Sequence, residues 1–203
     1  MTLDYNLAEK ITTLHDQCIV HWKISGVVLE ATDFYALVEQ NHSWNFQLWL
    51  AEDRARREDK GFEFVYNAKR EIDRFNQQRN NVMEAMDEWL FKQLKPSQDA
   101  HCPLHSETPG MIIDRLSIMA LKVYHMNLQV LRQDVPEEHR KLCESKRHVL
   151  KAQRGDLNQC LDNLLNEIKL KQRTFRVYHQ FKMYNDPELN PELYCPQGLS
   201  SQP

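Results

Sequence analysis

Polar side chains able to bind a ligand or exchange protons recur between His42 and Arg56 at the spacing of one helix face. At 100° per residue they fall within an arc of roughly 100°; they are His42, Asn45, Trp49, Glu52, Asp53 and Arg56. Carboxylates and an imidazole can bind a metal ion or transfer a proton, and a guanidinium can hold an anion. This row of polar residues therefore predicts either a site or a buried structural network.

The remainder of the same segment is apolar, which indicates a buried helix. Phe34, Val38, Phe46 and Leu48 are spread around the helical wheel, and a helix that is apolar all round is normally buried. The polar row then has no evident route to bulk water. Because burying such groups without partners costs on the order of several kcal/mol, we expect their partners on neighbouring helices.

Two later segments carry polar residues that could face the first row. In the segment 61–94, an arc of about 80° holds Lys69, Asp73, Asn76, Asn80, Glu84 and Asp87. After Pro109, a second group contains Asp114, Ser117 and His125, with Arg115 and Lys122 beside them. Three facing rows would form a polar interior site, the usual place for ligands in helical bundles. The alternatives are a solvated face for the first group and a buried hydrogen-bond network for the second.

Composition and periodicity predict the helices that position these side chains. Glycine occurs only 5 times in 203 residues, while Leu, Glu, Gln, Lys and Arg are plentiful, which favours an all-α fold. Apolar residues at steps of three and four predict helices over about 4–25, 32–57, 61–94, 109–134 and 136–173. Thr108 is the expected N-cap of the fourth helix, with Pro109 at its first position.

We expect one domain spanning 1–203, with an internal loop over 95–108 and loosely ordered ends at about 1–3 and 195–203. The segment after the last helix is rich in aromatic residues, unlike a disordered tail; these are Phe175, Tyr178, Phe181, Tyr184 and Tyr194. It should pack on the bundle up to about Tyr194. The predicted fold is an all-α, single-domain bundle of about five helices with an aromatic-rich C-terminal tail packed on it.

Charge and hydropathy exclude several classes of protein. The formal net charge is −3 and the pI is about 6.3, so no global field attracts DNA. No run of about 18 apolar residues predicts membrane insertion, and the start lacks a signal peptide. The five cysteines are scattered and odd in number, which indicates reduced thiols. We expect a soluble, cytoplasmic protein.

The sequence motifs argue against several kinds of active site, but they do not identify one. A divalent metal ion could be held by carboxylates and a histidine, namely Glu52, Asp53, Asp73, Asp114 and His125. The Glu-x-x-His spacing of di-iron bundles is absent. His101, Cys102 and His105 could bind zinc, but a fourth ligand is missing. The chain contains no GxSxG motif, phosphate-binding glycine loop or GxGxxG motif, which argues against hydrolase triads and classical nucleotide-binding folds.

Four ordered stretches carry a family resemblance: "NFQLWLAEDRAR", "KREIDRFNQQRNN", "ETPGMIIDRLSIMALKVYHM" and "FKMYNDPELNPELY". They resemble the successive motifs of a bacterial family described as a domain of unknown function, family 4254, from about His42 to Tyr194. The resemblance implies a genomic setting among genes for lipopolysaccharide and other envelope sugars, and it implies no particular reaction. Asn81 stands where the family shows an aspartate.

The family motifs also single out individual residues. Besides most members of the polar rows above, they include Arg70, Arg79, Tyr124, the Glu107–Gly110 stretch, and Lys182, Tyr184, Asn185 and Asp186 near the end of the chain. The residues that we expect to bind the ligand are Asn45, Trp49, Arg56, Lys69, Asn76, Asn80, Arg115, Ser117, Lys122 and Tyr124.

We therefore expect the protein to bind, and in an extended hypothesis to process, a small polar or anionic ligand such as a sugar phosphate or nucleotide sugar. Glu52, Asp53, Asp73, Asp114 and His125 would be the acid–base or metal-binding groups. Arg56, Arg115 and Lys122 would hold the anion. The alternative is a non-catalytic module that docks a glycosyltransferase or forms a homodimer.

Overall fold

The computed structural model describes residues 6–179, 181 and 188–191. The elements follow one another as α1 (Leu7–Ser25), α2 (Asp33–Ala55), the short 3₁₀ helix η1 (Glu58–Lys60), α3 (Phe62–Leu94), α4 (Pro109–Val130) and α5 (Glu137–Lys169). No strand occurs within these described ranges. The predicted all-α, single-domain bundle is confirmed. None of the described helices has the length and apolar character needed to cross a membrane.

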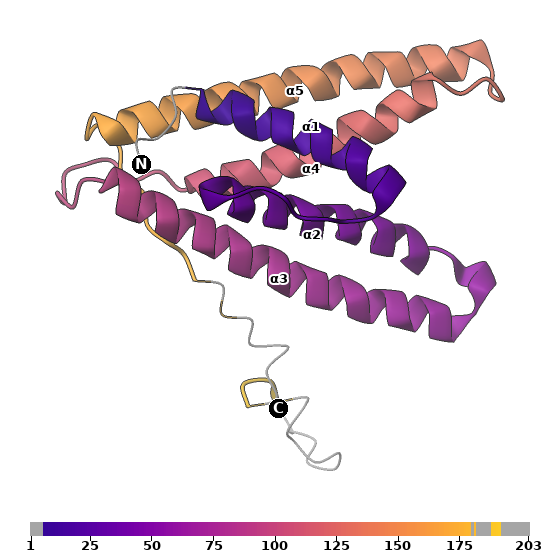
Figure 1. Cartoon of the computed structure of the whole chain (residues 1–203), viewed down its shortest axis with the longest axis horizontal. Helices are drawn as coiled ribbons and strands as arrows, with labels where there is room; N and C mark the ends of the chain where they lie inside the picture. Colours follow the sequence, from indigo (N-terminus) through magenta and orange to yellow (C-terminus); the bar gives the residue numbers. More distant parts are fainter. Residues whose placement is uncertain (1–5, 180, 182–187, 192–203) are drawn as a thin grey trace, which may run out of the picture.

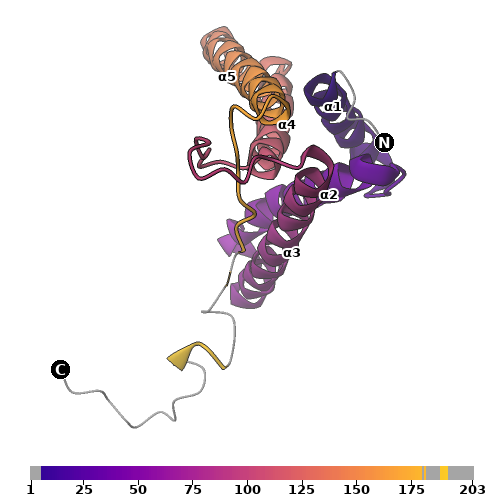
Figure 2. The same ribbon diagram turned by 90° about the vertical axis from the view of Figure 1, so that its left-hand side faces the viewer.

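The helices form two hairpins that pack against each other and against the first helix. Figure 1 shows α2 beside α3 and α4 beside α5, and Figure 2 shows the two pairs end on. Packing is most extensive within these two pairs, and α1 packs against α2, α4 and α5. The arrangement brings α2, α3 and α4 together, so their polar faces can meet.

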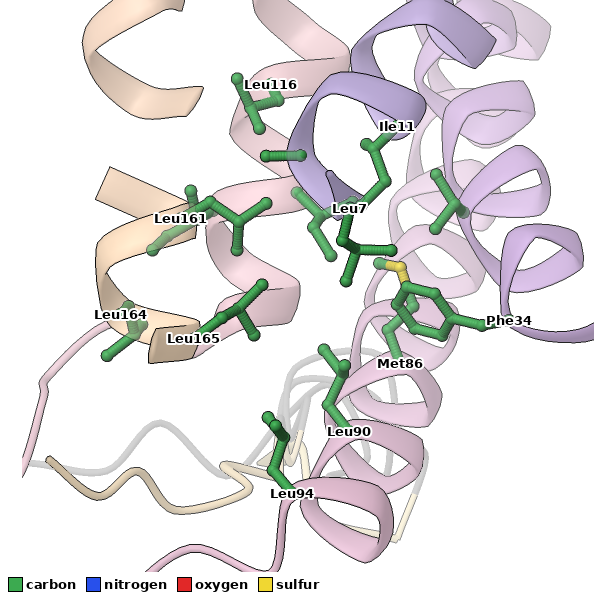
Figure 3. Close-up of a cluster of buried hydrophobic side chains, with 14 of the residues drawn as sticks. Leu7, Ile11, Phe34, Met86, Leu90, Leu94, Leu116, Leu161, Leu164 and Leu165 are labelled. Carbon is green, nitrogen blue, oxygen red and sulfur yellow. The ribbon is translucent and has the colours of Figure 1, made fainter. Parts of the chain in front are cut away.

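The main core forms where all five helices contribute apolar side chains. Leu7 and Phe34 pack with Met86, Leu116 and Leu161, and each of the five comes from a different helix (Figure 3). Burying a side chain of this size contributes about 1.5–3 kcal/mol. The predicted apolar stripe of α5 is buried in this core: its members there are Leu161, Leu164, Leu165 and Ile168.

Two helices end earlier than their apolar periodicity predicts. The fourth helix ends at Val130 and the fifth at Lys169. After α5, Lys171 takes a left-handed conformation with φ 60°, and the N–H groups of Gln172 and Arg173 donate to the Glu167 carbonyl oxygen at 2.9 and 3.3 Å. This backbone reversal stops the helix.

The connection between α3 and α4 pairs with the segment that follows α5. His105 N–H donates to the Thr174 carbonyl at 2.8 Å, and Thr174 N–H donates to the Pro103 carbonyl at 3.0 Å. Phe175 is buried, with its ring centroid 5.6 Å from that of Phe91. The expected packing of the tail therefore holds at Phe175.

Farther along the tail, the expectation of aromatic packing is wrong for Phe181. Its side chain is 83% exposed, and that of Tyr178 is 38% exposed. Of these three aromatic residues, Phe175 is the one that is buried in the main core. The predicted packing of Tyr184 and Tyr194, and the site role of Lys182, Asn185 and Asp186, lie outside the described residues.

Candidate functional site

The polar row of α2 divides into a buried half and an open half. His42 and Asn45 are buried, Trp49 and Glu52 are partly exposed, and Asp53 and Arg56 are exposed. The expectation that the whole row lacks a route to water is wrong for the last two turns. These turns lie next to η1, at the end of the α2–α3 hairpin (Figure 1).

The open half of the row lines a cleft of about 390 Å³ between α2, α3 and α4. We call it the α2–α3–α4 cleft. Its polar side chains are Asn45, Trp49, Glu52, Asp53 and Arg56 from α2, and Asn76 and Arg79 from α3. Leu48, Leu121 and Ile118 supply the apolar part of the wall. The structure thus brings six of the predicted site residues into one concavity, together with Arg79.

Charges in the α2–α3–α4 cleft are formally balanced. Arg56 Nη1 lies 3.1 Å from a Glu52 carboxylate oxygen and 2.5 Å from the Glu52 carbonyl oxygen. Arg79 Nε lies 3.8 Å from Asp114 Oδ1, is buried, and has no hydrogen-bond partner. Two carboxylates and two guanidinium groups therefore line the same space, and one buried donor stays unused.

A buried hydrogen-bond network fixes Asn45 at the inner end of the cleft. Asn45 Nδ2 donates to Asp114 Oδ1 and to Ser117 Oγ, both at 2.9 Å. Asn41 Nδ2 donates to the same Asp114 oxygen at 3.0 Å. Both of the bonds from Asn45 use its amide nitrogen, so its side-chain oxygen takes no part in them.

The network continues to two histidines whose rings contact each other at an interplanar angle of 32°. His42 Nδ1 lies 2.7 Å from Ser117 Oγ, and His42 Nε2 lies 3.0 Å from the His15 carbonyl oxygen. Only a donating Nε2 can bond to a carbonyl, so Nδ1 accepts from the Ser117 hydroxyl. The His15 and His42 ring centroids are 4.5 Å apart. Burial lowers the pKa of His42 to about 3 and that of His15 well below its usual value, so both rings are neutral.

The rings of His125 and Tyr124 pack behind Trp49, which forms part of the cleft wall. The His125 ring stacks on Trp49 with a centroid distance of 4.3 Å and an interplanar angle of 9°, and Tyr124 meets His125 edge-on at 5.4 Å. Burial lowers the pKa of His125, as does the Lys23 ammonium, while Asp53 opposes the shift. His125 and Tyr124 thus hold Trp49 in place and do not themselves line the cleft.

Other predicted residues lie outside the α2–α3–α4 cleft. Arg115 and Lys122 line a separate groove between α4 and α5. Lys69 and Asp73 pair with each other along α3, with 3.1 Å between Lys69 Nζ and Asp73 Oδ1. Asn80 is buried on α3, while Asp114 and Ser117 belong to the network behind the cleft. The polar row of α3 is therefore solvated at one end and buried at the other.

The candidate metal ligands do not converge in the part of the chain that the structure describes. There, no three His, Cys, Asp or Glu side chains are close enough together to hold a metal ion. In the 95–108 loop, His105 Nδ1 lies 2.6 Å from the Glu107 carbonyl oxygen, and Cys102 Sγ lies 3.5 Å from the Lys171 carbonyl oxygen. These loop side chains bond to the backbone.

Sequence reasoning missed two members of the network and gave Arg79 no role. Asn41 precedes Asn45 by one helical turn, so the helical spacing of two amides could have indicated it. His15 gave no such signal, because its contact with His42 joins α1 to α2. Arg79 was marked only by the family resemblance, and its place depends on how α3 packs against α4.

Comparison with known proteins identifies the family. The family described as "Protein of unknown function (DUF4254)" matches residues 35–177, which is more than half of the chain. The matched range contains the first three of the four stretches quoted above and ends before the fourth. Neither the curated proteins nor the solved structures gave a match. The chain therefore belongs to the DUF4254 family.

Proposed function

We propose that the α2–α3–α4 cleft binds the hydroxyl-bearing part of a small polar ligand, such as the sugar of a sugar phosphate or nucleotide sugar. The observation that carries this proposal is the set of donors and acceptors gathered around Trp49. Glu52 and Asp53 supply carboxylate acceptors, and Asn76 and Arg79 supply donors. A hydroxyl group both donates and accepts, so a balanced set of partners suits it.

The shape and wall of the cleft support the same ligand class. Small-molecule sites are concave and combine apolar surface with a few polar groups that fix orientation. Here Trp49 and Leu121 provide apolar surface, against which the C–H face of a sugar ring can pack. Arg79 Nε is buried, lies 3.8 Å from Asp114 Oδ1 and has no hydrogen-bond partner, and an unused buried donor costs about 1–3 kcal/mol. A ligand oxygen in the cleft would accept from the Arg79 guanidinium.

The family resemblance supplies the setting of this proposal: cytoplasmic assembly of lipopolysaccharide or another envelope polysaccharide in a bacterium. Turnover is an extension of the binding proposal. Glu52 and Asp53 are the carboxylates that line the cleft, so general acid–base chemistry would fall to them.

A thermal-shift and calorimetry screen tests the proposal. The probes are hexose 1-phosphates, nucleotide diphosphate hexoses and methyl hexosides. A ligand that binds only the folded protein raises the melting temperature by mass action. At a ligand concentration of 100 times Kd, the free energy of unfolding rises by about 2.7 kcal/mol. We expect Asp53→Asn and Arg79→Gln each to weaken binding at least about tenfold, which corresponds to about 1.4 kcal/mol.

The matched control is Arg74→Gln, which removes an exposed guanidinium from α3 away from the cleft. It should bind like the wild type. Equal affinities for the wild type, Asp53→Asn and Arg79→Gln would show that the ligand binds elsewhere. No shift with any probe would contradict the proposal.

A second candidate is a non-catalytic adaptor that docks a glycosyltransferase or another copy of the chain. Exposed apolar side chains at the end of α1 favour it: Ile24 is 85% exposed and Val20 is 56% exposed, with Val28 and Leu29 close by in sequence. Exposed apolar patches mark interaction surfaces when they are contiguous. A screen in which no probe shifts the melting temperature would make this the favoured candidate.

A further inference from the structure

A second concavity adjoins the α2–α3–α4 cleft at Ile118 of α4. This α4–α5 groove has a volume of about 500 Å³. Its lining is Arg115, Ile118, Met119 and Lys122 from α4, with Gln153, Asp156 and Leu157 from α5. The lining of the groove holds two cations and one carboxylate, whereas the lining of the cleft is balanced. Glu107, which is not part of the groove lining, pairs with Arg115.

The cleft and the groove share Ile118 in their walls. One apolar side chain therefore separates them. Arg115 and Lys122 precede and follow Ile118 by three and four residues, so all three lie on the same face of α4. A ligand that occupied the cleft and passed over Ile118 would meet both cations.

Arg115 and Lys122 differ in whether they must give up an existing ion pair to bind such a ligand. Arg115 forms an ion pair with Glu107 at 2.6 Å, and both side chains are well exposed. An exposed ion pair is worth about 0–1 kcal/mol, so an anion can compete for Arg115 easily. Lys122 is exposed and forms no hydrogen bond or ion pair with the described residues.

We infer that the ligand is elongated, with its hydroxyl-bearing part in the α2–α3–α4 cleft and a phosphate or diphosphate group in the α4–α5 groove. The inference rests on the proposed function. Arg115 and Lys122 are seven residues apart, about 10 Å along the helix axis, and their long side chains can converge above Ile118. Charge-assisted hydrogen bonds from both would then hold the anion.

The alternative position for the phosphate is the cleft itself, and charge argues against it. Glu52 and Asp53 would face the phosphate at close range, and Arg79 is already within 3.8 Å of Asp114. Bringing like charges together disfavours binding. The groove is the better location, because cations outnumber carboxylates in its lining and Lys122 has no ion-pair partner among the described residues. It would select a phosphorylated ligand over a neutral sugar.

The test compares phosphorylated and neutral probes on the same variants by calorimetry. The groove variant combines Arg115→Gln with Lys122→Gln, and the cleft variant is Asp53→Asn. We expect the groove variant to lose at least about tenfold affinity for a hexose 1-phosphate or nucleotide diphosphate hexose. Its affinity for the methyl hexoside should stay within about twofold of the wild type, while the cleft variant weakens every probe. Binding of the phosphorylated probes should also weaken with added salt.

The control is Lys146→Gln, which removes an exposed cation from α5 outside both concavities. Wild-type affinity of the groove variant for phosphorylated probes would overturn the inference while leaving the proposed function intact. An equal loss of affinity for phosphorylated and neutral probes would also overturn it, because the two substitutions would then be disturbing the fold and not removing contacts to a phosphate. Failure of the wild type to bind any probe would overturn the proposed function as well.

Discussion

At the residue scale, the histidines at the centre of the bundle are structural, and their neutrality is a condition of the fold. His42 donates to the His15 carbonyl and accepts from Ser117. A proton on His42 Nδ1 would turn that acceptor into a second donor and place a charge in a site without solvent. Burial is the largest cause of the lowered pKa of His42, and the positive charge of Arg154 adds to it.

This arrangement predicts a dependence of stability on pH. Below pH 6.5 the unfolded chain takes up a proton at His42 that the folded protein accepts only near pH 3. The unfolded state therefore binds more protons in this window, and the free energy of unfolding falls as the pH falls. From pH 7 to pH 5 the loss from His42 is about 2 kcal/mol. His15 acts in the same direction.

Urea denaturation at the two pH values isolates this contribution. His42→Gln should be less stable than the wild type at pH 7, and the gap between the two should shrink by about 2 kcal/mol at pH 5. His148→Gln, at an exposed position on α5, is the control and should leave the pH dependence unchanged. A gap of the same size at both pH values would rule out a neutral buried His42.

Another buried residue, Glu39, holds the connection between α1 and α2. Its Oε2 accepts from the backbone N–H groups of Glu30 and Ala31 at 2.9 and 2.8 Å, and its Oε1 lies 3.7 Å from Cys18 Sγ. Burial and the Glu39 charge raise the pKa of the Cys18 thiol to about 12. Cys18 is therefore a protonated, unreactive thiol.

At the element scale, the start of α4 is fixed by a carboxylate from α3. Asp87 accepts from Thr108 Oγ1 at 2.5 Å and from Gly110 N–H at 2.7 Å, while Thr108 Oγ1 accepts from Met111 N–H at 3.2 Å. The predicted N-cap at Thr108 is confirmed. Burial raises the pKa of Asp87 to about 6 against the lowering effect of these hydrogen bonds. The "ETPG" stretch thus positions the helix that borders both proposed binding regions.

The close approach of α3 to the start of α4 leaves no room for a side chain at Gly110. A Cβ atom there would lie 2.6 Å from Asp87 Oδ1 and 2.9 Å from the Met83 carbonyl oxygen. The carbonyl belongs to the backbone and cannot rotate away. We expect Gly110→Ala to lower the free energy of unfolding by about 1–3 kcal/mol, measured by urea denaturation.

The chain offers a matched control in Gly155, which lies inside α5 with no atom within 4 Å of a Cβ placed there. Gly155→Ala should raise the stability by about 0.5–1 kcal/mol, because alanine is the better helix former. Stabilisation by both substitutions would contradict the close approach of α4 to Asp87.

At the scale of the whole molecule, the segment after α5 closes the end of the bundle opposite η1. Thr174 bonds to the 95–108 loop through its backbone and through Oγ1, which donates to the Ser97 carbonyl at 2.8 Å. Lys171 Nζ donates to the Leu94 carbonyl at 3.3 Å. The segment therefore ties the end of α3 to the end of α5, and Phe175 fills the space between them.

Phenylalanine truncations along the segment test this closure. Phe175→Ala should cost about 3–5 kcal/mol, the usual loss for a fully buried phenylalanine. Phe181→Ala, at a residue 83% exposed, should change the stability by less than about 0.5 kcal/mol. Similar melting temperatures for the two variants would show that the segment does not close the bundle.

The sequence by itself determined the helices and the faces they present. Helical spacing predicts the buried stripe that includes Leu161 and Ile168, and short-range capping chemistry predicts the start of α4 at Thr108 and Pro109. The polar row on α2 was also readable, because residues three and four apart share a face whatever surrounds the helix. Each of these features depends on neighbours within a few residues.

Only the tertiary structure decided which of these faces meet. It placed Asp53 and Arg79 in one cleft, placed Arg115 and Lys122 in the α4–α5 groove, and brought His15 into contact with His42. The rotation and crossing of each helix are set by the packing of side chains distant in sequence, such as Leu7 against Met86 and Leu161. A helical period gives the direction of a side chain around its own axis, and the partner it meets depends on the packing of the whole core.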